Sequence, residues 1–145
     1  MKGMSSIVKK TTQLLSGMIF LYGIYIITHG HLTPGGGFAG GTIIAASLII
    51  LVLAFGSDEL TMVKRKEGSS VTESLAILAF LLFASLALII GTNIFFHNYL
   101  PEGIIGNLIS AGVIPLYNIL VGIEVAAALF TIILAFIIYK EEISK

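Results

Sequence analysis

The sequence contains no cysteine and no tryptophan, and it has few charged residues. Without cysteine, the chain cannot form a disulfide, an iron–sulfur cluster, a thiolate zinc site or a covalent haem attachment. Only 11% of the 145 residues are charged, whereas water-soluble domains carry about 25%. So few charges cannot cover the surface of a soluble globule. Together with a hydrophobic content of 57%, they predict an integral membrane protein.

The chain also has no excess of positive or negative charge. Eight Lys and Arg residues balance eight Asp and Glu residues. Nucleic-acid-binding proteins need a basic excess, so we expect no nucleic-acid partner. The longest polar stretch, residues 57–73, is too short for an appended soluble domain. We therefore expect no catalytic residue, no metal site and no cofactor, and we predict that the chain is not an enzyme.

Long uncharged stretches define the expected helices. No Asp, Glu, Lys or Arg occurs between residues 11 and 57, which leaves room for two membrane helices of about 20 residues each. Helix-breaking residues at 29–37 separate these two helices. A second uncharged stretch covers 74–101, and Pro115 falls in the first turn of the last expected helix, where its missing N–H costs nothing. The pattern predicts an all-α membrane protein, one domain over 1–145, with transmembrane helices near 12–28, 38–55, 72–95 and 115–139.

The positive charges predict the orientation of these helices. With four spans, every Lys and Arg falls on one side of the membrane, which the positive-inside rule makes cytoplasmic. We therefore expect both termini to be cytoplasmic and the loops around 29–37 and 96–114 to face outward. The first apolar run lacks a small-x-small cleavage site, which favours a permanent span over a signal peptide.

Glu124 is the most informative single residue. It lies nine positions after Pro115, or roughly 13 Å into the membrane at 1.5 Å per residue. A carboxylate there costs at least about 2.5–3.5 kcal/mol, so intramembrane acids are functional candidates. Tyr117 and Thr131 lie seven residues to either side and share its helical face. These three residues are ion-pathway candidates. The alternative is a protonated or hydrogen-bonded Glu124 that only holds two helices together.

A glycine-rich segment opens the second expected helix. It lacks the lysine and hydroxyl residue of a phosphate-binding P-loop, so a tight entry into the helix is the favoured interpretation. Exposed N–H groups at that helix start could alternatively hold an anion or a carbonyl. Small residues four apart, such as Gly122 and Ala126, favour close helix packing. The candidate structural residues are Pro34, Gly35, Gly36, Gly37, Phe38, Gly40, Gly41, Pro115, Asn118 and Gly122.

The remaining polar residues lie near the expected helix ends. His29, His31 and His97 fall at the outer ends of the first and third helices, either as haem or metal ligands or as interface residues in contact with water. Glu102 is expected to be solvated on the outer side. The mixed-charge segment 58–73 is expected to be a solvated loop.

Two segments together carry a family resemblance. One is HLTPGGGFAGG from His31 to Gly41, and the other is GVIPLYNILVGIEV from Gly112 to Val125. They resemble the B-type member of multisubunit Na+/H+ antiporters, the Mrp or Mnh type, and the resemblance extends over about residues 12–139. The form IPLYN, residues 114–118, is closer to the versions in archaeal membrane-bound hydrogenases and their sulfur-reducing relatives.

The resemblance implies a non-catalytic, multi-pass subunit of a module that exchanges Na+ for H+. Its implied partners are other membrane subunits, the lipid bilayer, and Na+ and H+ as transported ions. In the hydrogenase version, a peripheral arm oxidises ferredoxin and evolves hydrogen to drive the ion module. Glu124 lies inside the second matching segment, but antiporter versions are expected to carry another residue there at times. Glu124 would then tune the site rather than carry the ion.

Two other functions are also compatible with the sequence. A standalone four-helix cation or drug exporter would transport as a homodimer, although such exporters carry their membrane glutamate in the first helix. A haem- or quinone-binding membrane anchor would use the three outer histidines, although bis-histidine haem needs facing histidines inside the helices.

Overall fold

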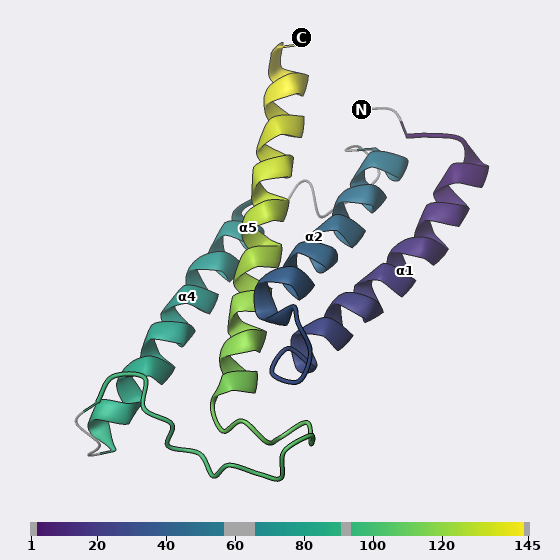
Figure 1. Ribbon diagram of the computed structural model, residues 1–145. Helices are drawn as coiled ribbons and strands as arrows, with labels where there is room; N and C mark the ends of the chain where they lie inside the picture. Colours follow the sequence, from purple (N-terminus) through teal and green to yellow (C-terminus); the bar gives the residue numbers. More distant parts are fainter. Residues whose placement is uncertain (1–2, 57–65, 91–93, 144–145) are drawn as a thin grey trace.

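The computed structural model describes residues 3–56, 66–90 and 94–143 (Figure 1). The described residues form the helices α1 (Ser6–Thr28), α2 (Gly36–Phe55), α4 (Lys66–Ile89) and α5 (Ile114–Ile143). Each of these four helices contains a stretch long and apolar enough to cross a membrane. The all-α prediction with four spanning helices is therefore confirmed.

The helices form a row in the order α1, α2, α5, α4, because α2 packs between α1 and α5, and α5 packs between α2 and α4. Along the direction of the helix axes, both chain termini lie at the same end of the bundle (Figure 1). We call this the terminal end; the α1–α2 turn and the long loop before α5 lie at the opposite, loop end. At the terminal end, Val52 of α2 packs with Phe130, Leu134 and Ile137 of α5 to form a buried cluster.

Glycines allow the central helices to approach backbone to backbone. A Cβ atom on Gly40 would lie 2.8 Å from the Gly23 carbonyl oxygen, at the contact of α1 with α2. A Cβ atom on Gly41 would lie 2.6 Å from the Gly122 carbonyl oxygen, at the contact of α2 with α5. Two adjacent glycines of α2 therefore contact two different helices, Gly40 contacting α1 and Gly41 contacting α5. Helices in lipid associate through this close packing, because no hydrophobic effect drives them together there.

The third predicted helix, 72–95, is wrong at both ends. Residues 66–73 form the first two turns of α4, so the prediction of a solvated loop over 58–73 fails for that part, and its earlier part lies outside the described residues. The helix ends at Ile89. Phe96 is already outside it, with φ of 63°, and its backbone N–H donates to the Ala84 carbonyl oxygen at 3.3 Å. Apolar residues continue in the sequence after α4 ends at Ile89. One of them, Phe96, packs its ring back against Phe80 of α4 and Tyr117 of α5.

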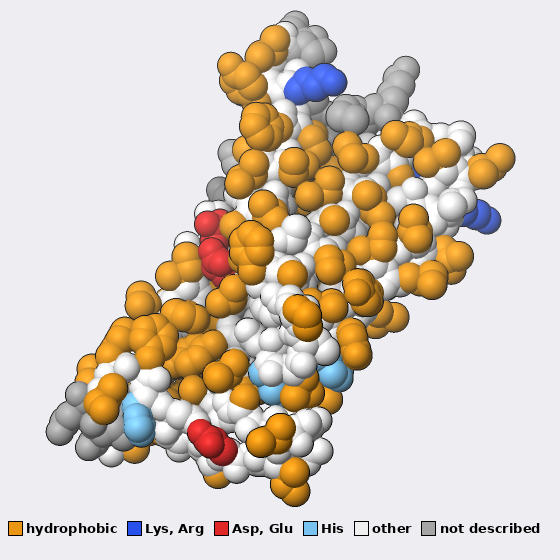
Figure 2. Space-filling model, viewed as in Figure 1, with side chains coloured by type: hydrophobic (Ala, Val, Ile, Leu, Met, Phe, Trp, Pro, Cys, Tyr) orange, Lys and Arg blue, Asp and Glu red, His pale blue; other side chains and the backbone are white. Residues whose placement is uncertain are grey.

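The outer faces of the row carry large apolar side chains. Leu14 and Leu21 on α1 and Leu82 on α4 are each more than half exposed. Figure 2 shows hydrophobic side chains spread over the visible surface, with basic side chains near the terminal end. Such a surface is stable only against lipid or other membrane helices.

Candidate functional site

The three ion-pathway candidates of α5 all face α4. Glu124 lines a small cavity of about 170 Å³ whose other walls include Ala76, Ile77 and Phe80 of α4. Tyr117 packs its ring against Phe80, with 5.0 Å between the ring centroids. The structure therefore places a polar stripe of α5 against α4, as the seven-residue spacing predicts.

Thr131 reaches α4 through a hydroxyl chain. Its Oγ1 donates a hydrogen bond of 2.7 Å to Ser69 Oγ, and Ser69 Oγ donates one of 3.0 Å to the Ala127 carbonyl oxygen. Ser69 belongs to the segment that sequence reasoning assigned to a loop, so this partner was missed. The hydroxyl chain sets the register between the first turn of α4 and the middle of α5.

We expect Ser69→Ala and Thr131→Val each to lower the stability of the α4–α5 contact by about 0.6–1.7 kcal/mol, the usual range for an interhelical hydrogen bond in a membrane. The double variant should lose less than the sum of the two, because both remove the same bond. Thermal unfolding of the detergent-purified protein measures this. Ser85→Ala is the matched control, since the Ser85 hydroxyl bonds to carbonyls of its own helix. Purely additive losses would contradict the interhelical role.

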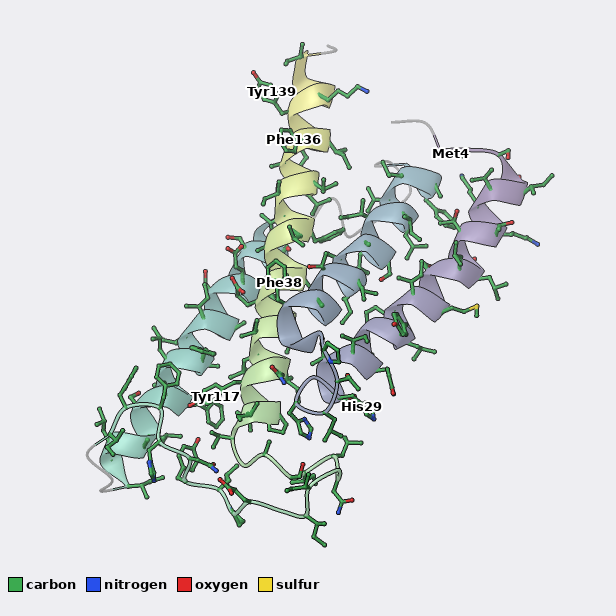
Figure 3. The ribbon with its side chains drawn as sticks, viewed as in Figure 1. Met4, His29, Phe38, Tyr117, Phe136 and Tyr139 are labelled. Atoms are coloured by element: carbon green, nitrogen blue, oxygen red, sulfur yellow. The ribbon has the colours of Figure 1, made fainter. Side chains whose placement is uncertain are left out.

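Tyr117 has a buried hydroxyl group without a hydrogen-bond partner among the described residues. Its ring is held between Phe80 and Phe96, and Figure 3 shows it on the α4 side of α5, toward the loop end. An unpartnered buried hydroxyl costs about 1–3 kcal/mol. A water molecule or an ion at this point of the interface would satisfy it.

The glycine-rich segment makes the tight entry into α2. Gly35 and Gly36 have φ values of 147° and 72°, which L side chains rarely adopt. A Cβ atom on Gly37 would collide with the Asn118 carbonyl oxygen, so the start of α2 lies directly on the first turns of α5. The Asn118 Nδ2 atom is buried there, and the described residues offer it no hydrogen-bond partner. The two motif segments therefore meet in space.

Phe38 and Pro34 do not join this contact. Phe38 is 67% exposed, and Pro34 is also exposed. Pro115 is the second residue of α5, where its missing N–H costs nothing. Gly122 packs against Ile27 of α1 as well as Gly41 of α2.

His29 and His31 lie in the α1–α2 turn, whereas His97 lies in the loop between α4 and α5. His29 stacks on Tyr25 with 4.1 Å between the ring centroids, at the α1–α2 turn (Figure 3). His31 Nε2 lies 3.3 Å from the Asn107 carbonyl oxygen and joins the two loops of this end, while His97 is exposed. In residues 3–56, 66–90 and 94–143, no group of three His, Asp or Glu side chains could hold a metal ion. For His29 and His31, these contacts support the structural interpretation.

A larger groove of about 640 Å³ lies over α2 and α5, between α1 and α4. Its lining is mainly apolar and includes Phe20, Ile44 and Phe130. No described acidic side chain lines this groove, whereas Glu124 lines the cavity between α4 and α5, so the α4–α5 interface is the candidate functional site.

Comparison with known proteins links the chain to one family. Residues 7–131 match the family model of a domain related to the MnhB subunit of a Na+/H+ antiporter. An uncharacterised protein of Methanocaldococcus jannaschii is 37% identical over 122 residues, which cover 81% of this chain and 46% of that protein. The B-type component of the Na+/H+ antiporter of Bacillus subtilis is 43% identical over 49 residues, about a third of each chain.

A solved structure has the same fold. It is a chain of the membrane-bound sulfane sulfur reductase, an archaeal respiratory membrane complex, with a TM-score of 0.76 and 36% identity. The match covers 92% of this chain and 58% of that chain. This chain therefore spans about half the length of the Methanocaldococcus relative and of the matching reductase chain.

Proposed function

Since this chain belongs to the family of MnhB-related Na+/H+ antiporter subunits, we propose that it is a non-catalytic subunit of a membrane module that exchanges Na+ for H+. It is a multi-pass membrane protein with four apolar helices. The observation that carries the proposal is Glu124, a carboxylate inside the membrane-spanning part of the longest helix, next to a cavity at a helix interface. Glu124 also lies within the part of the chain that the family model matches.

The parent complex is proposed to be a redox-driven one of archaeal type, in which ferredoxin oxidation drives hydrogen evolution or sulfur reduction. Similarity to a chain of an archaeal respiratory complex over 92% of this sequence supports that choice over a simple antiporter. The proposed orientation puts the terminal end in the cytoplasm, since the charged residues flanking the spans at that end include Lys9, Lys10 and Lys140.

The described basic side chains lie far from Glu124. Lys9 and Lys10 belong to the first turns of α1, and Lys140 to the last turn of α5, all at the terminal end. Glu124 is 16 residues before Lys140 on the same helix, or about 24 Å. Among the described residues no basic side chain lies near Glu124, and we propose that its positive counterpart is a side chain of a neighbouring subunit or the transported cation.

Purification from native membranes in mild detergent tests the subunit role. We expect the tagged chain to migrate on a native gel with large antiporter-like subunits, and mass spectrometry of that band to identify hydrogenase or sulfur-reductase subunits. Antiporter subunits without redox subunits would reassign it to a simple antiporter. A monomer or homodimer alone would refute the subunit proposal and favour a small exporter.

A further inference from the structure

Glu73 is an acidic residue that lies inside a membrane span and has no assigned role. It belongs to the apolar stretch Gly68–Ile89 of α4, about 8 Å along the helix from Gly68. Its neighbours Thr72 and Ser74 are exposed, whereas Glu73 is half-buried. The covered side of α4 packs on α5, so the Glu73 side chain lies on the α5 side of its helix.

The spacing along α4 places Glu73 next to the Glu124 cavity. Ser69, Glu73, Ala76 and Phe80 follow one another at intervals of four, three and four residues, which is one face of a helix. Ser69 bonds to α5 through Thr131 and Ala127, whereas Ala76 and Phe80 line the cavity next to Glu124. Glu73 lies between these two contacts, about one helical turn from each.

The view of the surface agrees with this placement. The acidic side chains that the structure describes are those of Glu73, Glu102 and Glu124. Figure 2 shows acidic side-chain atoms at mid-height over α4 and α5, separate from the acidic atoms in the loops at the loop end. The described acidic residues within the membrane spans, Glu73 and Glu124, thus both lie at the α4–α5 interface.

The α4–α5 interface therefore carries a series of polar groups along its length. From the terminal end, they are the Ser69–Thr131 hydroxyl pair, Glu73, Glu124 with its cavity, and the hydroxyl of Tyr117, which has no partner among the described residues. The cavity of about 170 Å³ is large enough for water, and Glu124 is the polar residue of its otherwise apolar lining. Water between carboxyl groups can carry a proton from one to the next, with one O–H bond formed for each one broken.

We propose that Glu73 is the second carboxyl group of this pathway and passes protons between Glu124 and the terminal end of the bundle. The pathway requires that one of the two carboxyl groups carries the proton that an entering cation displaces. One entering Na+ then displaces one proton, and charge balances. This inference rests on the proposed Na+/H+ exchange and adds the residue that α4 contributes.

The test measures Na+-dependent proton movement in inverted membrane vesicles that contain the whole complex. We expect Glu73→Gln to lower the exchange rate by about a hundredfold, the lower bound for losing a proton-transferring group. Glu73→Asp, which keeps a carboxyl group, should retain most of the activity. Glu102→Gln is the matched control, because Glu102 is an exposed acid in the loop before α5, and it should leave the rate unchanged.

A second readout does not depend on transport. A hydrophobic carbodiimide modifies protonated carboxyl groups inside membranes, and peptide mass spectrometry locates the modified residue. In the wild-type complex we expect Glu73 and Glu124 to be modified, Na+ to protect both, and Glu102 to stay unmodified. If Glu73→Gln prevents assembly of the complex, carbodiimide labelling of the wild-type complex tests the proposal instead. An unmodified Glu73 would then overturn the proposal.

The two proposals can fail separately. Normal exchange with Glu73→Gln, together with lost exchange with Glu124→Gln, would remove Glu73 from the pathway and leave the proposed function intact. Normal exchange with both variants in an assembled complex would remove both carboxyl groups and overturn this inference together with the ion-pathway role of Glu124.

Discussion

Replacing Glu124 with glutamine is expected to abolish Na+-dependent proton exchange by the assembled complex. Glutamine keeps the size of the side chain and its hydrogen-bonding capacity but cannot bind or release a proton. Glu124 lies on α5 next to a cavity whose other walls include residues of α4. Removal of a proton-transferring group costs about a hundredfold or more. The measurement is the Na+-induced pH change in inverted vesicles.

Two controls separate transport from packing. Glu124→Asp retains an ionisable group and should keep part of the activity, whereas Glu124→Ala should be as inactive as the glutamine variant. A native gel must show that each variant complex is assembled. If an intact Glu124→Gln complex exchanges Na+ for H+ at the normal rate, Glu124 is a packing residue and the chain is a scaffold.

Replacing Gly41 with leucine is expected to have the largest effect on stability. A Cβ atom at this position would lie 2.6 Å from the Gly122 carbonyl oxygen and 3.0 Å from the Val125 Cβ atom. The obstacle is backbone, which cannot rotate away, so α2 and α5 would have to separate. We expect a loss of at least about 3 kcal/mol, the upper part of the usual range for overpacking. Thermal unfolding and recovery from detergent extraction both measure it.

Gly17→Leu is the matched control for this variant. Gly17 also lies in a membrane helix, but a Cβ atom on it meets nothing within 4 Å among the described residues. The same added side chain there should leave the melting temperature of the isolated protein nearly unchanged. Equal losses at the two positions would show that leucine is disfavoured for a reason other than the α2–α5 contact. A large loss only in the whole complex would place a partner protein against Gly17.

Much of the fold could be predicted because apolar length and charge position are local properties. A span of about 20 uncharged residues identifies a membrane helix without any knowledge of its neighbours. The seven-residue spacing of Tyr117, Glu124 and Thr131 likewise follows from helix geometry, and in the structure all three face α4. The ion-pathway role of these residues stays a prediction.

The errors concern segments whose local chemistry is ambiguous. Gly68, Ser69 and Ser70 are typical of a loop, yet they lie in the first turns of α4, because Ser69 satisfies its hydroxyl against α5 rather than in water. Apolar residues after Ile89 extended the expected helix, but the Phe96 ring packs back on Phe80 and Tyr117. Hydropathy cannot distinguish a residue that continues a helix from one that folds back against it.

The sequence by itself determined the membrane class, the four spanning helices and the polar face of α5, because composition, length and periodicity need only one helix at a time. The tertiary structure alone decided which helices touch. The glycine contacts place α2 between α1 and α5, and the Ser69–Thr131 bond sets the register of α4. That register places Glu73 on α4 one helical turn from Ala76, which lines the Glu124 cavity. Which face of one helix meets which face of another depends on close packing between residues far apart in the chain, and no local pattern records it.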